Sequence, residues 1–248
     1  MPTPFSHLLI SHLLLSDGAL SSTAQQMIQA DRPAFLLGGV VADARPNGSQ
    51  RSDTHFYHYT EPMPDHPWRE MLRRYPALQQ PKSDAHRAFL AGYVAHLAVD
   101  EYWSRYLLRP HIAEADWGKD IYDRFFVLHL LLIYMDERDE NQLPEAIPDT
   151  LRQSIPDEWL PFIPDQTICE WRDFIADQIL GESQTLAIFG ARIKREASEL
   201  RELLDDANFM EQRLWGNITR TLFSKIEASL YQFAREQMEI YLAELASI

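Results

Sequence analysis

Apolar residues in this chain recur mostly at the three- and four-residue spacing of helix turns. From residue 170 to the end they stay on one face, for example at Leu222, Ile226 and Leu230, and this period predicts amphipathic helices. In the first half, the pattern predicts helices near residues 6–17, 22–30, 68–75, 83–105 and 120–136. The 9 glycines against 15 prolines favour helices broken by prolines over strands joined by tight turns. The pattern therefore predicts an all-α protein.

Two proline-rich stretches interrupt these helices. Residues 44–66 are predicted to form a loop, which is longer than a compact domain usually holds without a functional reason. Residues 144–166 contain three Ile-Pro-Asp tripeptides, and each is predicted to begin a helix, because proline fits the first turn and aspartate favours the positive end of the helix dipole. Residues 35–41 are apolar and contain a Gly-Gly pair, which allows either a close helix contact or a turn.

The composition narrows the classes of function. At 46% hydrophobic and 24% charged residues, the chain can bury a sizeable core. The formal charge of -14 disfavours nucleic-acid binding, although a local basic cleft on an acidic protein would still allow it. The single Cys169 rules out an intrachain disulfide, and the N-terminus lacks a secretory signal. The longest apolar run, residues 125–135, is too short to span a bilayer, so we expect a cytoplasmic protein without a transmembrane segment.

Chemistry-bearing residues concentrate in the first hundred positions. All but two of the nine histidines lie at or before His96, and Asp100 follows it four residues later. On a helix, this spacing places an imidazole and a carboxylate on one face, close enough to hold one metal ion. The neighbouring residues are apolar, so a buried aspartate here needs a metal or a cationic partner. A hydrogen-bonded His–Asp pair in the core is the alternative interpretation of this motif.

Three further residues could complete a metal site. His7 lies in the first apolar helix, Asp43 follows the apolar 35–41 segment, and His55 lies in the predicted loop. Together with His96 and Asp100 they supply two carboxylates and three imidazoles. This mixture of nitrogen and oxygen ligands suits zinc, iron or manganese.

Four segments of the sequence resemble the zinc-dependent phospholipase C family. They are Phe-Ser-His-Leu-Leu-Ile at 5–10, the stretch from Gly38 to Ala44, Thr-His-Phe at 54–56, and Ala88 to Asp100 with its His-x3-Asp ending. The resemblance covers about residues 1–105. It implies an all-α bundle related in fold to the S1/P1 nucleases, with additional C-terminal helices here, and a cluster of up to three zinc ions.

The resemblance also implies a role for each candidate. His7 would bind one zinc ion, His55 and His96 would bind a second, and Asp100 would bridge the two. Asp43 would lie beside them, as a ligand or as the catalytic base. In the family, the metal activates a water for attack on a phosphoester.

The sequence departs from the family at both ends of its metal cluster. Secreted members use an N-terminal tryptophan as a zinc ligand, whereas this chain begins with Met1 and has no signal to remove. Members with the full cluster also carry a downstream His-x3-Glu, but here His129 is followed four residues later by Ile133. We therefore expect only one or two ions, zinc in the first instance, with iron or manganese as alternatives. The residues considered as supports for the ligands are His12, Asp53, His58 and Glu101.

The sequence thus predicts a metal-dependent phosphoesterase acting on a small phosphoester or a phospholipid head group. The alternative is a non-hydrolytic helical protein whose His/Asp site holds a structural metal. A phosphohydrolase of the HD type is disfavoured, because the sequence contains no His-Asp dipeptide. Residues 1–143 are expected to form the metal-binding core, and residues 144–248 a helical part on the same domain without a chemistry-bearing motif.

Overall fold

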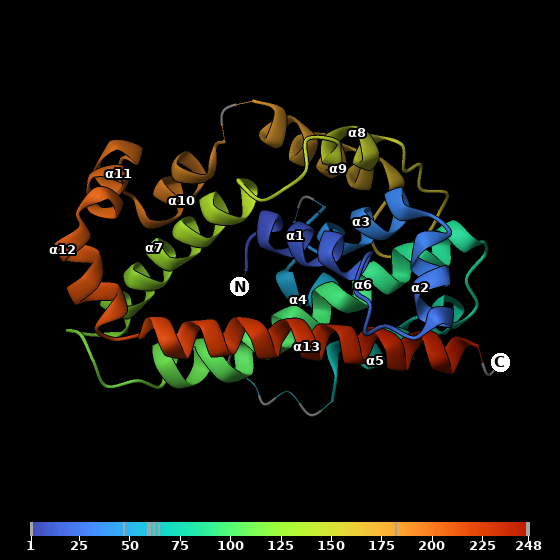
Figure 1. Ribbon diagram of the computed structural model, residues 1–248, viewed down its shortest axis with the longest axis horizontal. Helices are drawn as coiled ribbons and strands as arrows, with labels where there is room; N and C mark the ends of the chain where they lie inside the picture. The colour runs from blue at the N-terminus through green and yellow to red at the C-terminus, as the bar shows by residue number, and fades with distance from the viewer. Residues whose placement is uncertain are drawn as a thin grey trace.

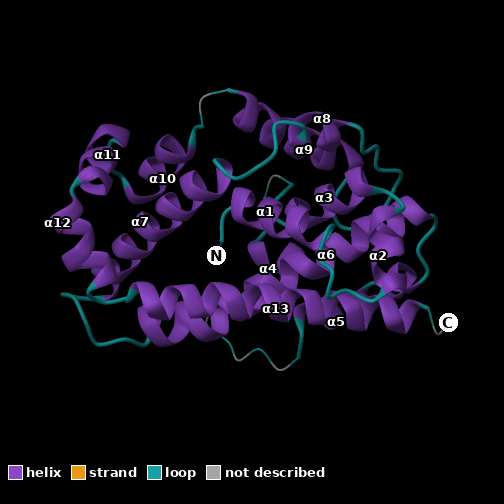
Figure 2. Cartoon of the chain, in the orientation of Figure 1, coloured by secondary structure: helices purple, strands orange, loops and turns teal. Residues whose placement is uncertain are grey.

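The computed structural model describes residues 2–46, 48–58, 61, 63, 65–181 and 183–246. Within these residues the chain forms thirteen α-helices and no strand (Figure 2). The predicted all-α fold with additional C-terminal helices is confirmed. No helix in the described ranges combines the length and the apolar character needed to cross a bilayer.

The helices of the first half are α1 (Pro4–Leu14), α2 (Ser22–Gln29), α3 (Arg32–Val41), α4 (Arg51–His55), α5 (Pro67–Arg74), the 3-10 helix η1 (Pro76–Gln79), α6 (Asp84–Trp103), the π-helix η2 (Ser104–Ala113) and α7 (Ile121–Glu140). Those of the second half are α8 (Ile147–Arg152), α9 (Asp165–Leu180), α10 (Thr185–Ile193), α11 (Ala197–Asp205), α12 (Ala207–Met210), the π-helix η3 (Glu211–Trp215) and α13 (Arg220–Leu245).

The predicted loop at 44–66 is wrong in its middle, where α4 forms a short helix. The cause is local capping: the Asp53 carboxylate accepts the backbone N–H of Gln50 at 2.8 Å, which satisfies a free donor at the helix start. The prolines of residues 44–66 predicted a loop and gave no sign of this capping interaction. Two of those prolines, Pro62 and Pro64, lie outside the described residues.

The Ile-Pro-Asp motif begins a helix at two of its three positions. Helix α8 starts at the first motif and α9 at the third. The middle motif, residues 155–157, is not helical. The next residue, Glu158, adopts a left-handed φ of 48°, its carbonyl accepts a hydrogen bond from Lys82 at 2.9 Å, and its N–H donates to Asp165 at 2.7 Å. Tertiary hydrogen bonds therefore override the local helix signal there.

Helix α6 lies at the centre of the molecule, with α3 packed on it and α13 running beside it along the long axis (Figure 1). The buried apolar residues form two clusters, one around α1, α3 and the first part of α6, and one around η2, α7 and η3. Each cluster takes residues from both halves of the chain, because α8, α9 and the end of α13 join the first and α10 joins the second. Both clusters thus contain residues of the C-terminal helices.

Glycines let α3 and α6 approach at backbone distance. A Cβ atom on Gly38 would clash with the carbonyl oxygen of Phe89, and one on Gly92 would clash with that of Phe35. The Gly-Gly pair therefore serves a close helix contact and not a turn. The contact holds the end of α3 against the middle of α6 and so sets the distance between Asp43 and His96.

Two buried carboxylates of α7 hold the start of α1 and the start of α10. Asp139 accepts a hydrogen bond from the Ser6 hydroxyl at 2.5 Å, and Asp136 accepts one from Thr185 of α10. Both side chains are 3% exposed. Burial raises the pKa of Asp136 to about 6, although hydrogen bonds from Thr185 and Thr3 act in the opposite direction. These contacts fix the end of the helix that carries His7.

Asp136 is expected to make the protein less stable as the pH rises from 4 to 7. The folded chain keeps the proton of Asp136 up to about pH 6, whereas the unfolded chain loses it near 3.8. Stability present below pH 4 is therefore lost as the pH passes through 6. Urea unfolding at pH 4.5 and 7.5 should show that the wild type loses about 2 kcal/mol relative to Asp136→Asn over this interval. A difference that is independent of pH would contradict a protonated Asp136, and Asp149→Asn serves as a surface control.

Candidate metal centre

The structure brings the five candidate residues together from four elements. His7 comes from α1, Asp43 follows α3, His55 ends α4, and His96 and Asp100 lie one turn apart on α6. Four of the five are buried, and only Asp43 is partly open, with its side chain 19% exposed. The sequence-predicted set thus forms one cluster in space.

Asp100 lies at the centre of this cluster. Its Oδ1 is 3.3 Å from Nε2 of His7, and its Oδ2 is 3.2 Å from Nε2 of His55 and 3.7 Å from Nε2 of His96. Nε2 of His55 is also 3.5 Å from Oδ1 of Asp43. Three imidazoles therefore direct the same ring atom at one buried carboxylate.

Backbone and hydroxyl contacts orient two of the imidazoles. Nδ1 of His96 is 2.9 Å from the carbonyl oxygen of Gly39, which can only accept, so Nδ1 carries the hydrogen and Nε2 keeps its lone pair. Nδ1 of His55 is 2.9 Å from the Thr54 hydroxyl and 3.3 Å from the Arg51 carbonyl, which favours the same tautomer. The two Nε2 atoms are 3.4 Å apart. Two lone pairs facing one another need a proton or a metal ion between them.

Several buried polar atoms of the cluster are unsatisfied. Among the described residues, no hydrogen-bond partner is found for either ring nitrogen of His7 or for Oδ1 of Asp100. The His7 ring stacks on that of His96, with centroids 3.7 Å apart and planes 12° apart. Unpartnered buried polar atoms are rare because they lose their water without compensation. A metal ion would supply the missing partner, so the donor set fits such an ion.

The electrostatics keep Asp43, His96 and Asp100 in the protonation states that metal ligands need. Burial would raise the pKa of Asp100, but the charge of the Arg51 guanidinium, together with the neighbouring imidazoles of His55 and His7, holds it well below its usual range. Burial would also raise the pKa of Asp43, and the neighbouring imidazoles of His55 and His96 lower it instead. Burial lowers the pKa of His96 to about 3, with the charge of His7 acting in the same direction. Ionised carboxylates and a neutral imidazole bind metal without first losing a proton.

Two groups of ligand atoms are compact enough to hold a metal ion. One comprises His7, Asp43 and His96, and the other His55, His96 and Asp100, with all ligand atoms of a group within 4.8 Å of one another.

The sequence profile of the zinc dependent phospholipase C family matches residues 6–132, just over half of the chain. The chain belongs to this family. No curated protein and no solved structure matched the chain in the corresponding comparisons.

The resemblance predicted from the four sequence segments is thus confirmed, and the matched region of this zinc dependent phospholipase C family member extends further, into α7. His129 lies in the matched region but belongs to neither ligand group. Its Nδ1 is 2.6 Å from the Phe125 carbonyl oxygen of its own helix.

The residues proposed from sequence as supports for the ligands act differently. Glu101 is buried but contacts His66 at 2.9 Å and Arg105 at 3.0 Å, and burial raises its pKa despite the His66 hydrogen bond. Asp53 caps α4, and His58 is exposed. His12 is half-buried and its Nδ1 has no partner among the described residues. The observed supports are the Gly39 carbonyl and the Thr54 hydroxyl.

Arg51 is the cluster residue that the sequence interpretation missed. Its guanidinium forms an ion pair with Asp100 and lies 15% exposed beside the fully buried carboxylate. Its position in the sequence, four residues before His55, could have identified it, because this spacing places both side chains on one face of α4. Arg51 therefore lies between Asp100 and the solvent and compensates the negative charge of the carboxylate.

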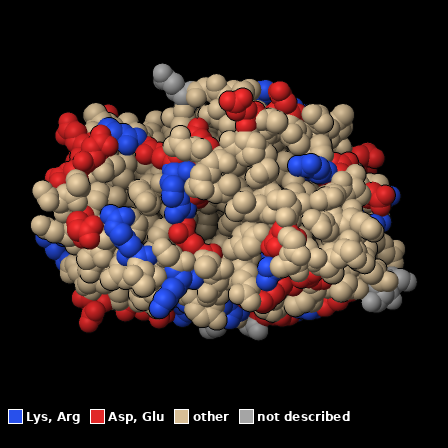
Figure 3. All heavy atoms as spheres, in the orientation of Figure 1, with Lys and Arg blue, Asp and Glu red and all other residues tan. Residues whose placement is uncertain are grey.

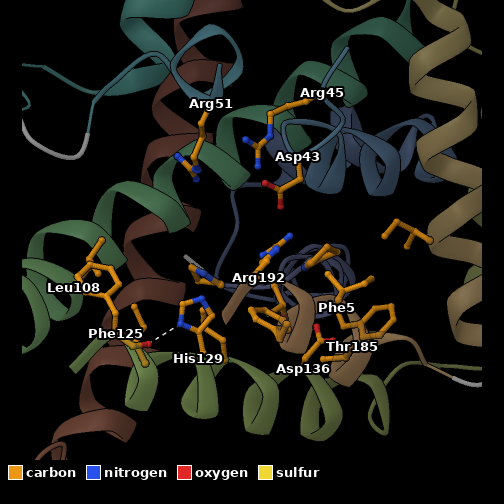
Figure 4. Close-up of a pocket in the computed structure, with 18 of the residues that line it drawn as sticks. Phe5, Asp43, Arg45, Arg51, Leu108, Phe125, His129, Asp136, Thr185 and Arg192 are labelled. Carbon is orange, nitrogen blue, oxygen red and sulfur yellow. Dashed lines mark hydrogen bonds between the residues drawn. The ribbon is translucent and has the colours of Figure 1, made fainter. Parts of the chain in front are cut away.

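A cavity of about 540 Å³ adjoins the cluster at Asp43 and Arg51. Its far wall is formed by α7, α9 and α10, including His129, Phe174 and Phe189. Figure 4 shows Asp43 and Arg51 on one side of this space and the side chains of α7 on the other. The surface view in Figure 3 shows a hollow near the middle of the molecule, with acidic and basic side chains around it. The C-terminal half, which held no chemistry-bearing motif, supplies much of this wall.

Proposed function

We propose that this protein is a metal-dependent phosphoesterase that hydrolyses a small phosphoester or a phospholipid head group at the His/Asp cluster. The observation that carries the proposal is the buried, ionised Asp100 surrounded by the Nε2 atoms of three imidazoles. Membership of the zinc dependent phospholipase C family supports zinc, in one or two ions. Iron and manganese accept the same donor set.

The two ligand groups would hold the metal. Asp43 with His7 and His96 would form the part next to the cavity, and Asp100 with His55 and His96 the deeper part. When bound, such a metal polarises a phosphoryl oxygen and lowers the pKa of a water molecule. Asp43 is the partly exposed member and lines the cavity, so a substrate would reach the cluster from its side. Asp43 would serve there as a ligand or as the base that accepts a proton from water.

The two halves of the chain would have separate tasks in this proposal. Residues 1–143 would form the metal-binding core, since they contain every proposed ligand. Residues 144–248 would complete the same domain and supply the wall of the cavity through α9 and α10. Substrate selection would then rest mainly with the half that carries no ligand.

A structural metal site is the second candidate, and one observation favours it. Four of the five residues are at most 1% exposed, and Arg51 covers the central carboxylate. A structural site is closed by protein ligands, whereas a catalytic site keeps an open position. Metal bound without turnover would favour this second function.

The test measures metal and turnover on the same preparations. Elemental analysis of the wild type should give one or two equivalents of zinc, iron or manganese per chain, and the double variant His96→Ala with Asp100→Ala should give none. His111→Ala is the matched control, because His111 belongs to neither ligand group. Turnover of bis(p-nitrophenyl) phosphate and of p-nitrophenyl phosphate should disappear with the metal. Absence of metal in the reconstituted wild type would overturn the proposal.

A further inference from the structure

The cavity beside the cluster has mostly apolar walls, with Asp136, His129 and Gln178 among them, and arginines at its mouth. Its walls include Phe5 of α1, Leu128 of α7, Ile175 of α9 and Ile188 of α10. The volume of about 540 Å³ falls within the usual range for a pocket that encloses one small organic molecule. Such walls favour a hydrocarbon portion of a ligand over a sugar or a free nucleotide.

Four arginines line the cavity; Arg109 is paired with Glu114, and the other three come from separate parts of the chain. Arg45 follows α3, Arg51 lies on α4 and Arg192 on α10, and all three line the cavity together with Asp43. Figure 4 shows their side chains directed toward the space beside Asp43. Arg45 and Arg192 are exposed and form no ion pair with the residues that the structure describes, and Arg192 stacks on Phe189 at 5.0 Å. This positive group is unusual on a chain with a formal charge of -14.

We infer that the cavity binds a single-chain amphiphile with an anionic phosphate head. The hydrocarbon chain fills the apolar interior, and Arg45 and Arg192 hold the phosphate at the mouth, next to Asp43 and the ligand cluster. This inference rests on the proposed function, because it names the substrate class of that same site. It selects a phosphate monoester of a hydrocarbon chain over a zwitterionic head group.

The selection follows from the chemistry of the mouth. Guanidinium groups form paired hydrogen bonds with phosphate oxygens and add charge attraction. A quaternary ammonium group is instead recognised by aromatic faces, and it would meet the positive charges of Arg45 and Arg192 here. Each methylene buried in the apolar interior should tighten binding roughly three- to fourfold until the cavity is full.

Binding to the metal-free, full-length protein tests this inference apart from metal binding and turnover. Hexyl, octyl and decyl phosphate, below their critical micelle concentrations, would be titrated by calorimetry against the matching alkyl phosphocholines. We expect the affinity for the phosphates to rise with chain length and to exceed that for the phosphocholines at least tenfold. Equal binding of both series, or no dependence on chain length, would overturn the inference.

Variants locate the two parts of the ligand. Arg192→Gln and Arg45→Gln should each weaken octyl phosphate binding roughly tenfold, as expected for the loss of a charged hydrogen bond. Ile188→Trp should abolish the dependence on chain length by filling the interior. Arg220→Gln is the matched control, since Arg220 is exposed and lies outside the cavity lining. An equal loss in Arg220→Gln would assign the binding to the surface in general and contradict the inference.

These outcomes separate the inference from the proposed function. Alkyl phosphate binding without metal or turnover would sustain the ligand class and refute the phosphoesterase. Metal and turnover on bis(p-nitrophenyl) phosphate without alkyl phosphate binding would sustain the phosphoesterase and refute the ligand class.

Discussion

Arg51→Met is expected to destabilise the metal-free protein by about 3 kcal/mol, because it leaves a buried charge without its partner. Asp100 is 0% exposed and its carboxylate is held ionised first by the Arg51 guanidinium. A divalent metal bound at the cluster would replace this positive charge. We therefore expect zinc to restore most of the lost free energy of unfolding, measured by urea titration with a chelator and with excess zinc.

Two comparisons make this prediction specific. Arg195→Met removes an exposed ion pair with Glu199 and should change the free energy of unfolding by less than about 1 kcal/mol. Adding Asp100→Asn to Arg51→Met should recover stability in the chelator, since no buried charge is then left. An equal loss with and without zinc would contradict the prediction, because zinc would then not replace the charge of Arg51 beside Asp100.

The helices were predictable because their signals are local. The periodic apolar residues of α13 and the proline and aspartate at the starts of α8 and α9 act within a few residues of one another. The middle Ile-Pro-Asp carries the same signal and forms no helix, because Lys82 and Asp165 bind the backbone of Glu158 instead. Such long-range competition is invisible in a single segment.

The candidate site shows the same limit. The spacing of His96 and Asp100 is a property of one helix and could be deduced directly. The positions of His7, Asp43 and His55 depend on how α1, α3 and α4 meet α6, so their residue types made them candidates but only the family resemblance assigned them roles in one cluster. The arginines at the cavity mouth belong to three separate elements and form no motif along the chain.

The cavity wall was unpredictable for a further reason. Side chains that line an apolar cavity have the same character and helical spacing as side chains that fill a core. Phe174 of α9 and Phe189 of α10 could therefore have been either. Only the cavity beside them in the folded protein distinguishes the two cases.

Gly92→Ala should affect both the stability and the metal site, because the α3–α6 contact leaves no room for a Cβ. The new methyl group would clash with the Phe35 carbonyl and would lie 2.8 Å from the backbone nitrogen of Gly39. The helices would have to separate. Overpacking of this kind lowers the free energy of unfolding by about 3 kcal/mol, and the higher helix propensity of alanine offsets about 1 kcal/mol of that loss.

The same separation should weaken metal binding, because His96 lies one turn after Gly92 and is oriented by the Gly39 carbonyl at 2.9 Å. Loss of such an orienting hydrogen bond typically lowers metal affinity 10- to 100-fold. Urea unfolding of the metal-free protein and zinc competition with a chromophoric chelator would measure the two effects separately. Gly18→Ala provides the control, because a Cβ there meets nothing within 4 Å. If Gly92→Ala lost stability but kept the zinc affinity of the wild type, the contact between α3 and α6 would hold the fold without setting the geometry of the cluster.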